Sequence, residues 1–275
     1  MLATRLLTVF VAAAFLIPFS LYANAWGFSV LAAMICGLVL WEWLALTSIG
    51  PAMRWLLLSV WVGLVVGALL DPWLIQTPWA LGLVGWVGLV WLLYVPYALW
   101  RVRTPNGPTA AITSAWLMLG TWAAVWLSRE QSLAFMVSIF ALVWLADTAA
   151  YFGGRALGRR KLAPRISPGK TWEGVITAVL ANLVYLWLAA RFWSDSYPQL
   201  LVEGFGPIGA ALMVVLLTAV SVMGDLHQSL LKRQAGVKDS GHLLPGHGGF
   251  FDRFDALIAV TPVALALLLA ADRLR

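Results

Sequence analysis

The segment from Ser229 to Asp255 gathers aspartates, basic residues, glycines and histidines in a chain that is otherwise mostly apolar. Ionisable groups next to apolar spans are costly in a membrane, so their presence indicates a function. Lysine and arginine bind phosphate oxygens, and carboxylates hold Mg²⁺, which in turn binds phosphates. Glycines let backbone N–H groups approach an anion closely. These residue types therefore predict a site for a metal–polyphosphate complex.

A second polar segment covers residues 153–171. Isolated carboxylates at helix ends are often solvated caps, but a group of them among many cations favours a shared site. A membrane enzyme with such a site could use a nucleotide from the cytosol and a lipid from the bilayer. Half of the 12 acidic residues lie in or beside the two polar segments, namely Asp147, Glu173, Asp225, Asp239, Asp252 and Asp255.

Two familiar motifs are incomplete in these segments. Gly169-Lys170-Thr171 resembles the end of a P-loop, but Pro164 stands where that motif requires its first glycine. His242 and His247 are five residues apart in a glycine-rich stretch without cysteines, which is not a zinc-ligand pattern. For the histidines, hydrogen bonding within the loop and direct phosphate contact both stay open.

The composition indicates an integral membrane protein. Of 275 residues, 62% are hydrophobic and 11% are charged, whereas soluble domains average about 45–50% and about 25%. The 17 tryptophans fit aromatic belts at the membrane interfaces. The single cysteine, Cys36, lies in an apolar segment and is expected to be a packing residue. Despite a net charge of +6, no basic run with interleaved aromatic residues suggests nucleic-acid binding.

Apolar stretches of about 20 residues are long enough to cross a bilayer as helices. We expect a single all-α, polytopic membrane helix bundle over residues 1–275, with about nine transmembrane helices and polar catalytic loops at about 153–171 and 224–253. The expected spans are roughly residues 6–24, 27–47, 53–71, 78–100, 109–127, 131–152, 172–192, 205–223 and 254–271.

The distribution of basic residues predicts the orientation of the spans. With the N-terminus in the cytoplasm, most of the 18 lysines and arginines fall on the cytoplasmic side, as the positive-inside rule expects. Arg273 and Arg275 are the misfit. The first segment also resembles a signal peptide, with Ala23-Asn24-Ala25 as a cleavage site, but its length favours a retained span.

Residues 229–255 resemble the signature of the phosphatidate cytidylyltransferases, also called CDP-diacylglycerol synthases. The pattern is Ser-x-Leu-Lys-Arg, then Lys-Asp-x-Gly, then Pro-x-His-Gly-Gly-Phe-x-Asp-Arg-Phe-Asp. Upstream, residues 147–151 (Asp-Thr-Ala-Ala-Tyr) and 167–174 (Ser-Pro-Gly-Lys-Thr-Trp-Glu-Gly) resemble the other motifs of that family. The resemblance covers the whole chain and is specific in its second half.

The resemblance implies a reaction and its cofactors. Phosphatidate and CTP would give CDP-diacylglycerol and pyrophosphate, with Mg²⁺ bound by Asp225 and Asp252 and with K⁺ as a second candidate cation. The expected partners are CTP, phosphatidate and bilayer lipid, and a homodimer is left open. The expected location is the inner membrane of a bacterium, with the active site facing the cytoplasm.

The residues themselves suggest how such a site would work. The phosphate monoester of the lipid has a second pKa of about 6, so it is largely dianionic and requires no strong general base. Positioning and charge neutralisation then carry the catalysis. The candidate catalytic residues are Lys170, Lys232, Lys238, Asp239, His247 and Arg253, and the candidate substrate-binding residues are Ser167, Arg233, Gly248 and Gly249.

Several of these residues have simpler interpretations. Lys232 and Arg233 end an amphipathic stretch and could contact anionic headgroups instead. Asp147, Asp239 and Asp255 are expected to orient other groups or to form salt bridges. Glu42, between two tryptophans, is expected to be an interfacial residue, with membership of the site as the less favoured alternative.

Two other functions fit the sequence less well. A CDP-alcohol phosphotransferase would require paired aspartates at helical spacing beside a Gly-x-x-Ala-Arg element, which is missing. A non-enzymatic anion or lipid transporter would carry charges within several broken spans. Here the charges gather toward one face of the membrane, which disfavours transport.

Overall fold

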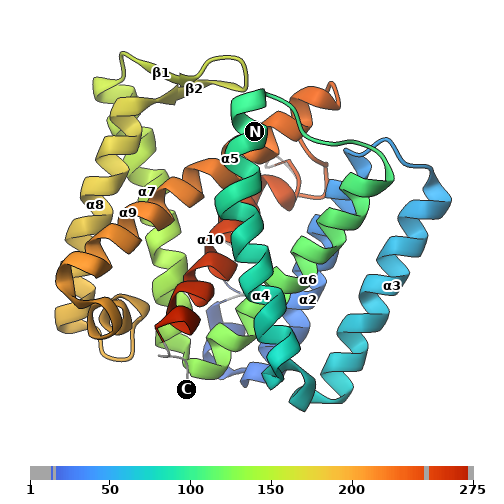
Figure 1. Cartoon of the computed structure of the whole chain (residues 1–275), viewed down its shortest axis with the longest axis horizontal. Helices are drawn as coiled ribbons and strands as arrows, with labels where there is room; N and C mark the ends of the chain where they lie inside the picture. Colours follow the sequence, from blue (N-terminus) through green and yellow to red (C-terminus); the bar gives the residue numbers. More distant parts are fainter. Residues whose placement is uncertain (1–13, 15–16, 245–247, 272–275) are drawn as a thin grey trace.

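The computed structural model describes residue 14 and residues 17–244 and 248–271 (Figure 1). In this part of the chain, eight helices are long and apolar enough to cross a membrane. The predicted all-α, multi-pass membrane fold is therefore confirmed. The predicted span 6–24 lies largely outside the described residues, so the ninth helix and the cytoplasmic N-terminus stay predictions.

Most spans begin and end within a few residues of the expected positions, but α9 is longer at both ends than the expected 205–223. Prolines stand at the first helical position of α3, α4 and α6, where the missing N–H costs nothing. A 3₁₀ helix, η1 (Pro72–Gln76), precedes α4, and a π-helical turn, η2 (Val90–Tyr94), joins α4 to α5 in one span. The α-helices are α2 (Ala25–Ala45), α3 (Pro51–Leu70), α4 (Pro78–Leu89), α5 (Val95–Arg101), α6 (Pro108–Gln131), α7 (Leu133–Leu157), α8 (Trp172–Phe192), α9 (Tyr197–Gln234) and α10 (Phe251–Ala270).

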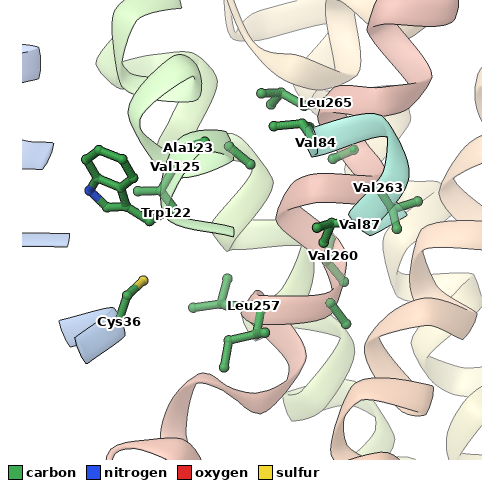
Figure 2. Close-up of a cluster of buried hydrophobic side chains, with 14 of the residues drawn as sticks. Cys36, Val84, Val87, Trp122, Ala123, Val125, Leu257, Val260, Val263 and Leu265 are labelled. Carbon is green, nitrogen blue, oxygen red and sulfur yellow. The ribbon is translucent and has the colours of Figure 1, made fainter. Parts of the chain in front are cut away.

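Helix α10 lies at the centre of the bundle. It packs against α9, α4, α6 and α7, while α3 lies at the periphery against α2 and α6 (Figure 1). Figure 2 shows the core between these helices, where Leu257 and Val260 of α10 face Val87 of α4 and Val125 of α6. Because lipid tails are as apolar as these side chains, close packing holds the helices together.

The two polar segments are more ordered than predicted. The first was expected to be a loop over 153–171, but α7 continues to Leu157 and an antiparallel hairpin follows. Its strands are β1 (Lys161–Ala163) and β2 (Ser167–Thr171). The second was expected over 224–253, but α9 continues to Gln234 and α10 begins at Phe251.

Helix α9 extends beyond its predicted apolar segment because one side of the helix stays buried there. Leu226 and Leu230 form a small apolar cluster with Ile166 of the hairpin. The polar residues that ended the predicted span thus lie on one side of a helix that continues. At its other end, α9 is kinked at Gly206, whose φ of 69° suits glycine, and Pro207 starts the longer part.

The connections at one end of the bundle are tied together. Asn106 donates to the Ser48 hydroxyl over 2.8 Å, which links the α5–α6 and α2–α3 connections. The backbone N–H of Thr104 donates to the side chain of Gln234 over 3.0 Å, which links the α5–α6 connection to the end of α9. The hairpin lies at this same end (Figure 1). The hairpin and the α9–α10 connection, which form most of the predicted site, therefore lie at the same end of the bundle.

Candidate active site

A cavity of about 570 Å³ opens at this end of the bundle, between α7, β2, α9 and α10. Five residues that were predicted from separate motifs line this cavity. They are Ser167, Lys170, Asp225, Asp252 and Arg253. Asp147 and Asp255, expected to support the site, also line it. The polar side chains in its wall are those of Asp147, Tyr151, Arg155, Ser167, Lys170, Thr171, Asp225, Asp252, Arg253 and Asp255.

A close crossing of α9 and α10 creates this wall. A β-carbon added at Gly224 would lie 2.7 Å from the backbone oxygen of Asp255 and 3.0 Å from Cβ of Ala259. Only glycine allows the two helices to approach so closely. Asp225 therefore directly follows the point at which α9 meets Asp255 and Ala256 of α10.

Asp225 is joined to the hairpin by an ion pair. Nζ of Lys170, on β2, lies 2.5 Å from Oδ2 of Asp225. The Ser229 hydroxyl donates to Oδ1 over 3.2 Å. The two charged side chains are 22% and 33% exposed, respectively, so both remain accessible to a ligand in the cavity.

Asp252 is held by donors from two directions. On Oδ1, it accepts hydrogen bonds from Lys232 Nζ at 2.6 Å and from Gln228 Nε2 at 2.7 Å, both on α9. On Oδ2, it accepts from the backbone N–H groups of Ser240 at 2.9 Å and of Gly249 at 3.0 Å. The side chain of Asp252 is 9% exposed. These bonds fix one carboxylate edge to α9 and the other to the connection before α10.

The other predicted residues lie around the cavity or outside the described part. Arg233 is exposed, and its Nε donates to a backbone oxygen of the hairpin turn over 3.5 Å. Lys238 and Asp239 are exposed in the α9–α10 connection and do not belong to the cavity wall. Gly248 has a φ of 80° beside Asp252. His247 lies outside the described residues.

The sequence interpretation missed the role of Glu42. It was expected at the membrane interface, but the structure buries it to 2% exposure at the end of α2. It accepts hydrogen bonds from the Ser240 hydroxyl and from the N–H groups of Phe250 and Phe251. A carboxylate inside an apolar helix is itself the signal that could have found it.

The carboxylates of the cavity suit a hard divalent cation. In the described part of the chain, no three His, Cys, Asp or Glu side chains are arranged to enclose a metal by themselves. Mg²⁺, however, usually binds through one or two carboxylates plus water and substrate phosphates. The oxygens of Asp225 and Asp252, in the wall of one cavity, fit that mode of binding.

Comparison with known proteins gives a consistent result. The sequence profile of the cytidylyltransferase family matches residues 3–271. A Haemophilus influenzae protein named phosphatidate cytidylyltransferase is 46% identical over 132 residues, covering 48% of this chain and 44% of that protein. A Pseudomonas aeruginosa protein of the same name is 44% identical over 157 residues, or 56% and 55% of the two chains. The matched segments thus span about half the length of these relatives.

Proposed function

Because this chain belongs to the cytidylyltransferase family, we propose that it transfers the cytidylyl group of CTP to phosphatidate. The products would be CDP-diacylglycerol and pyrophosphate. The observation that carries this proposal is a cavity at one end of a membrane helix bundle, where aspartates from α7, α9 and α10 meet basic side chains of the hairpin and α10. Such a cavity can bind a polyphosphate and a lipid phosphate side by side.

The reaction needs two anions to approach each other. A phosphate oxygen of phosphatidate attacks the α-phosphorus of CTP and forms the new P–O bond. The bond from the α-phosphorus to the oxygen that bridges to the β-phosphorus breaks, and pyrophosphate leaves with that electron pair. No proton has to be removed, because the attacking oxygen is already ionised near neutral pH.

The cationic side chains of the cavity neutralise this charge. Lys170 and Arg253 line the cavity, and Lys232 pairs with Asp252, which also lines it. Ser167, also in the wall, offers a hydroxyl to a phosphate oxygen. Held on a rigid scaffold, these groups stabilise charge where it develops without having to reorganise.

Asp225 and Asp252 are the proposed holders of Mg²⁺, with K⁺ as a second cation. When bound, the metal would neutralise phosphate charge and align the attacking and leaving oxygens. Each of the two aspartates is paired with a lysine. We propose that, when CTP binds, these lysines turn from the carboxylates to its phosphates.

The proposed setting is the inner membrane of a bacterium, with the N-terminus and the cavity on the cytoplasmic side, where CTP is available. The basic hairpin at the cavity end supports this orientation under the positive-inside rule. A homodimer remains a further proposal, which cross-linking in intact membranes would test.

The deciding experiment is an assay of the purified chain with labelled CTP, phosphatidate and Mg²⁺. We expect label to move into a lipid-soluble product and pyrophosphate to appear in equal amount. Release of pyrophosphate without a labelled lipid would instead indicate hydrolysis, and no reaction of either kind would contradict the proposed function.

A further inference from the structure

A second, apolar cavity of about 270 Å³ lies between α2, α6, α7 and α10. Its wall includes Ile35 of α2, Met118 of α6, Phe140 of α7 and Leu257 of α10. These four helices form a continuous hydrophobic core, so this cavity is lined by side chains that lipid tails would contact favourably. We refer to it as the apolar groove.

The apolar groove adjoins the cavity of the candidate active site, which we call the polar cavity. Arg253 lines both of them. On α7, Trp144 faces the groove, and Asp147, about one helical turn further on, faces the polar cavity. A ligand with a phosphate in one cavity could therefore place an apolar chain in the other, with the Arg253 guanidinium near the junction.

The length of the groove fits one leaflet of a bilayer. On α2 it extends from Val39, near the polar end, to Phe28, which is about 16 Å at 1.5 Å per residue. The hydrocarbon core of a bilayer is about 30 Å thick, so one acyl chain extends through about half of that. An acyl chain from the leaflet at the cavity end would therefore span the groove.

We propose that the apolar groove binds one acyl chain of the phosphatidate substrate while the lipid phosphate lies beside Arg253. This rests on the proposed function and adds a location for the lipid. It also explains why a polar reaction centre is built into the end of a helix bundle, since the tail never has to leave an apolar environment.

The test compares phosphatidates of different chain length in the purified full-length chain. Ile35 is half-buried in the groove wall, so Ile35→Trp should fill the groove with little disturbance of the core. We expect kcat/KM for dipalmitoyl phosphatidate to fall by at least about tenfold, while dihexanoyl phosphatidate, too short to depend on the groove, is turned over as before.

The matched control is Leu56→Trp on α3, which is 57% exposed and lies outside the groove. Equal effects of Ile35→Trp on both lipids, or no effect on either, would overturn the groove assignment. Failure of the unmodified chain to turn over either lipid would instead overturn the proposed function, so the two failures are distinguishable.

Glu42 carries a second, independent inference. The described neighbours of its carboxylate include the Ser240 hydroxyl, 2.8 Å from Oε2, and the N–H groups of Phe250 and Phe251 at 3.1 and 2.9 Å. The two backbone groups begin α10, whose own N-cap residue makes no side-chain capping bond. Glu42 therefore caps α10 from another helix, at the positive end of the helix dipole.

The same carboxylate is linked to Asp252 through Ser240. The Ser240 hydroxyl lies 2.8 Å from Glu42 and 3.1 Å from Oδ2 of Asp252, and the Ser240 N–H also donates to Oδ2. At Gly249, a β-carbon would collide with the Glu42 carboxylate, so glycine is required for this approach. Glu42 does not line the polar cavity.

We infer that Glu42 is a positioning residue, which sets the place of Asp252 in the cavity by way of Ser240 and the start of α10. If so, Glu42→Gln should lower kcat by about a hundredfold, the scale of a misplacement of about 1 Å, with KM for phosphatidate little changed. Mn²⁺ binding by the protein alone, measured by electron paramagnetic resonance, should weaken in parallel.

A double-mutant cycle separates positioning from general stability. The effects of Glu42→Gln and Ser240→Ala on kcat should not add, because both act on Asp252. Glu130→Gln is the matched control, since Glu130 accepts a hydrogen bond from Trp126 but lies away from the cavity wall. Additive effects, or a loss of activity that only follows the loss of folded protein, would contradict the inference.

Discussion

Lys170 and Asp225 form an ion pair of 2.5 Å that joins the β hairpin to α9 in the wall of the polar cavity. The two residues lie in different sequence motifs and on different elements. The pair therefore brings residues of the two polar segments together at one cavity. It also places a cation and a proposed metal ligand within reach of the same phosphate.

The two proposed metal ligands should be indispensable. Asp225→Asn and Asp252→Asn keep the size of the side chain but remove its charge, and each should lower CTP-dependent turnover by at least about a hundredfold. Membrane insertion should be unchanged, as measured by membrane fractionation and by protection from added protease. An aspartate whose asparagine variant keeps near-normal activity would lose its assigned role.

Alanine substitution of two lysines in the hairpin should have very different effects on activity. Lys170 faces the cavity and pairs with Asp225, whereas Lys161 is exposed on β1. Lys170→Ala should reduce kcat/KM for CTP by about a hundredfold, because phosphate charge is left unneutralised. Lys161→Ala should change it by less than about threefold. A complete loss of activity in Lys161→Ala would show that the whole hairpin takes part.

The close crossing of α9 and α10 should be sensitive to volume. Gly224→Val places a branched side chain against the α10 backbone, which should lower the free energy of unfolding by about 1–3 kcal/mol. Thermal unfolding in detergent measures this. The matched control is Gly85→Ala in α4, where nothing lies within 4 Å, and its effect should stay within about 1 kcal/mol. Equal unfolding temperatures for the two variants would argue against the tight crossing.

Removal of divalent cations should stop the reaction reversibly. Oxygen ligands such as Asp225 and Asp252 favour Mg²⁺ over thiophilic metals. We expect a chelator to abolish transfer of label from CTP to lipid, and added Mg²⁺ to restore it. Retention of full activity after exhaustive chelation, checked by metal analysis of the protein, would refute a metal-assisted reaction.

Much of the fold could be predicted from hydropathy, because about 20 apolar residues can cross a bilayer only as a helix. The structure of the two polar segments could not be predicted in this way. Asp225 and Lys232 lie on a helix, although their polarity suggested a loop, since the opposite side of α9 stays buried. The hairpin also escaped notice, because β1 and β2 are three and five residues long and show no clear alternation.

The site was predictable in its residue types but not in its connections. The motifs pointed to Ser167, Lys170, Asp225, Asp252 and Arg253, and the structure places all five in one cavity wall. Which of these residues pair with one another depends on how the helices cross, and helix crossings cannot be recognised from the local sequence. The position of Glu42 in an apolar helix marks it as unusual, but its partners could not be predicted, because they lie near the far end of the chain.

The cap that α2 provides for α10 also bears on how the protein is made. Glu42 and Phe250 are separated by 208 positions, so a ribosome delivers the acceptor to the bilayer long before its donors exist. During that interval the carboxylate has to be tolerated in an apolar setting without these partners, at a real energetic cost. Completion of the last helix relieves it. A chain that stalls before Phe250 would therefore keep this carboxylate without its backbone donors, and we expect it to be less stable in the membrane than the finished protein.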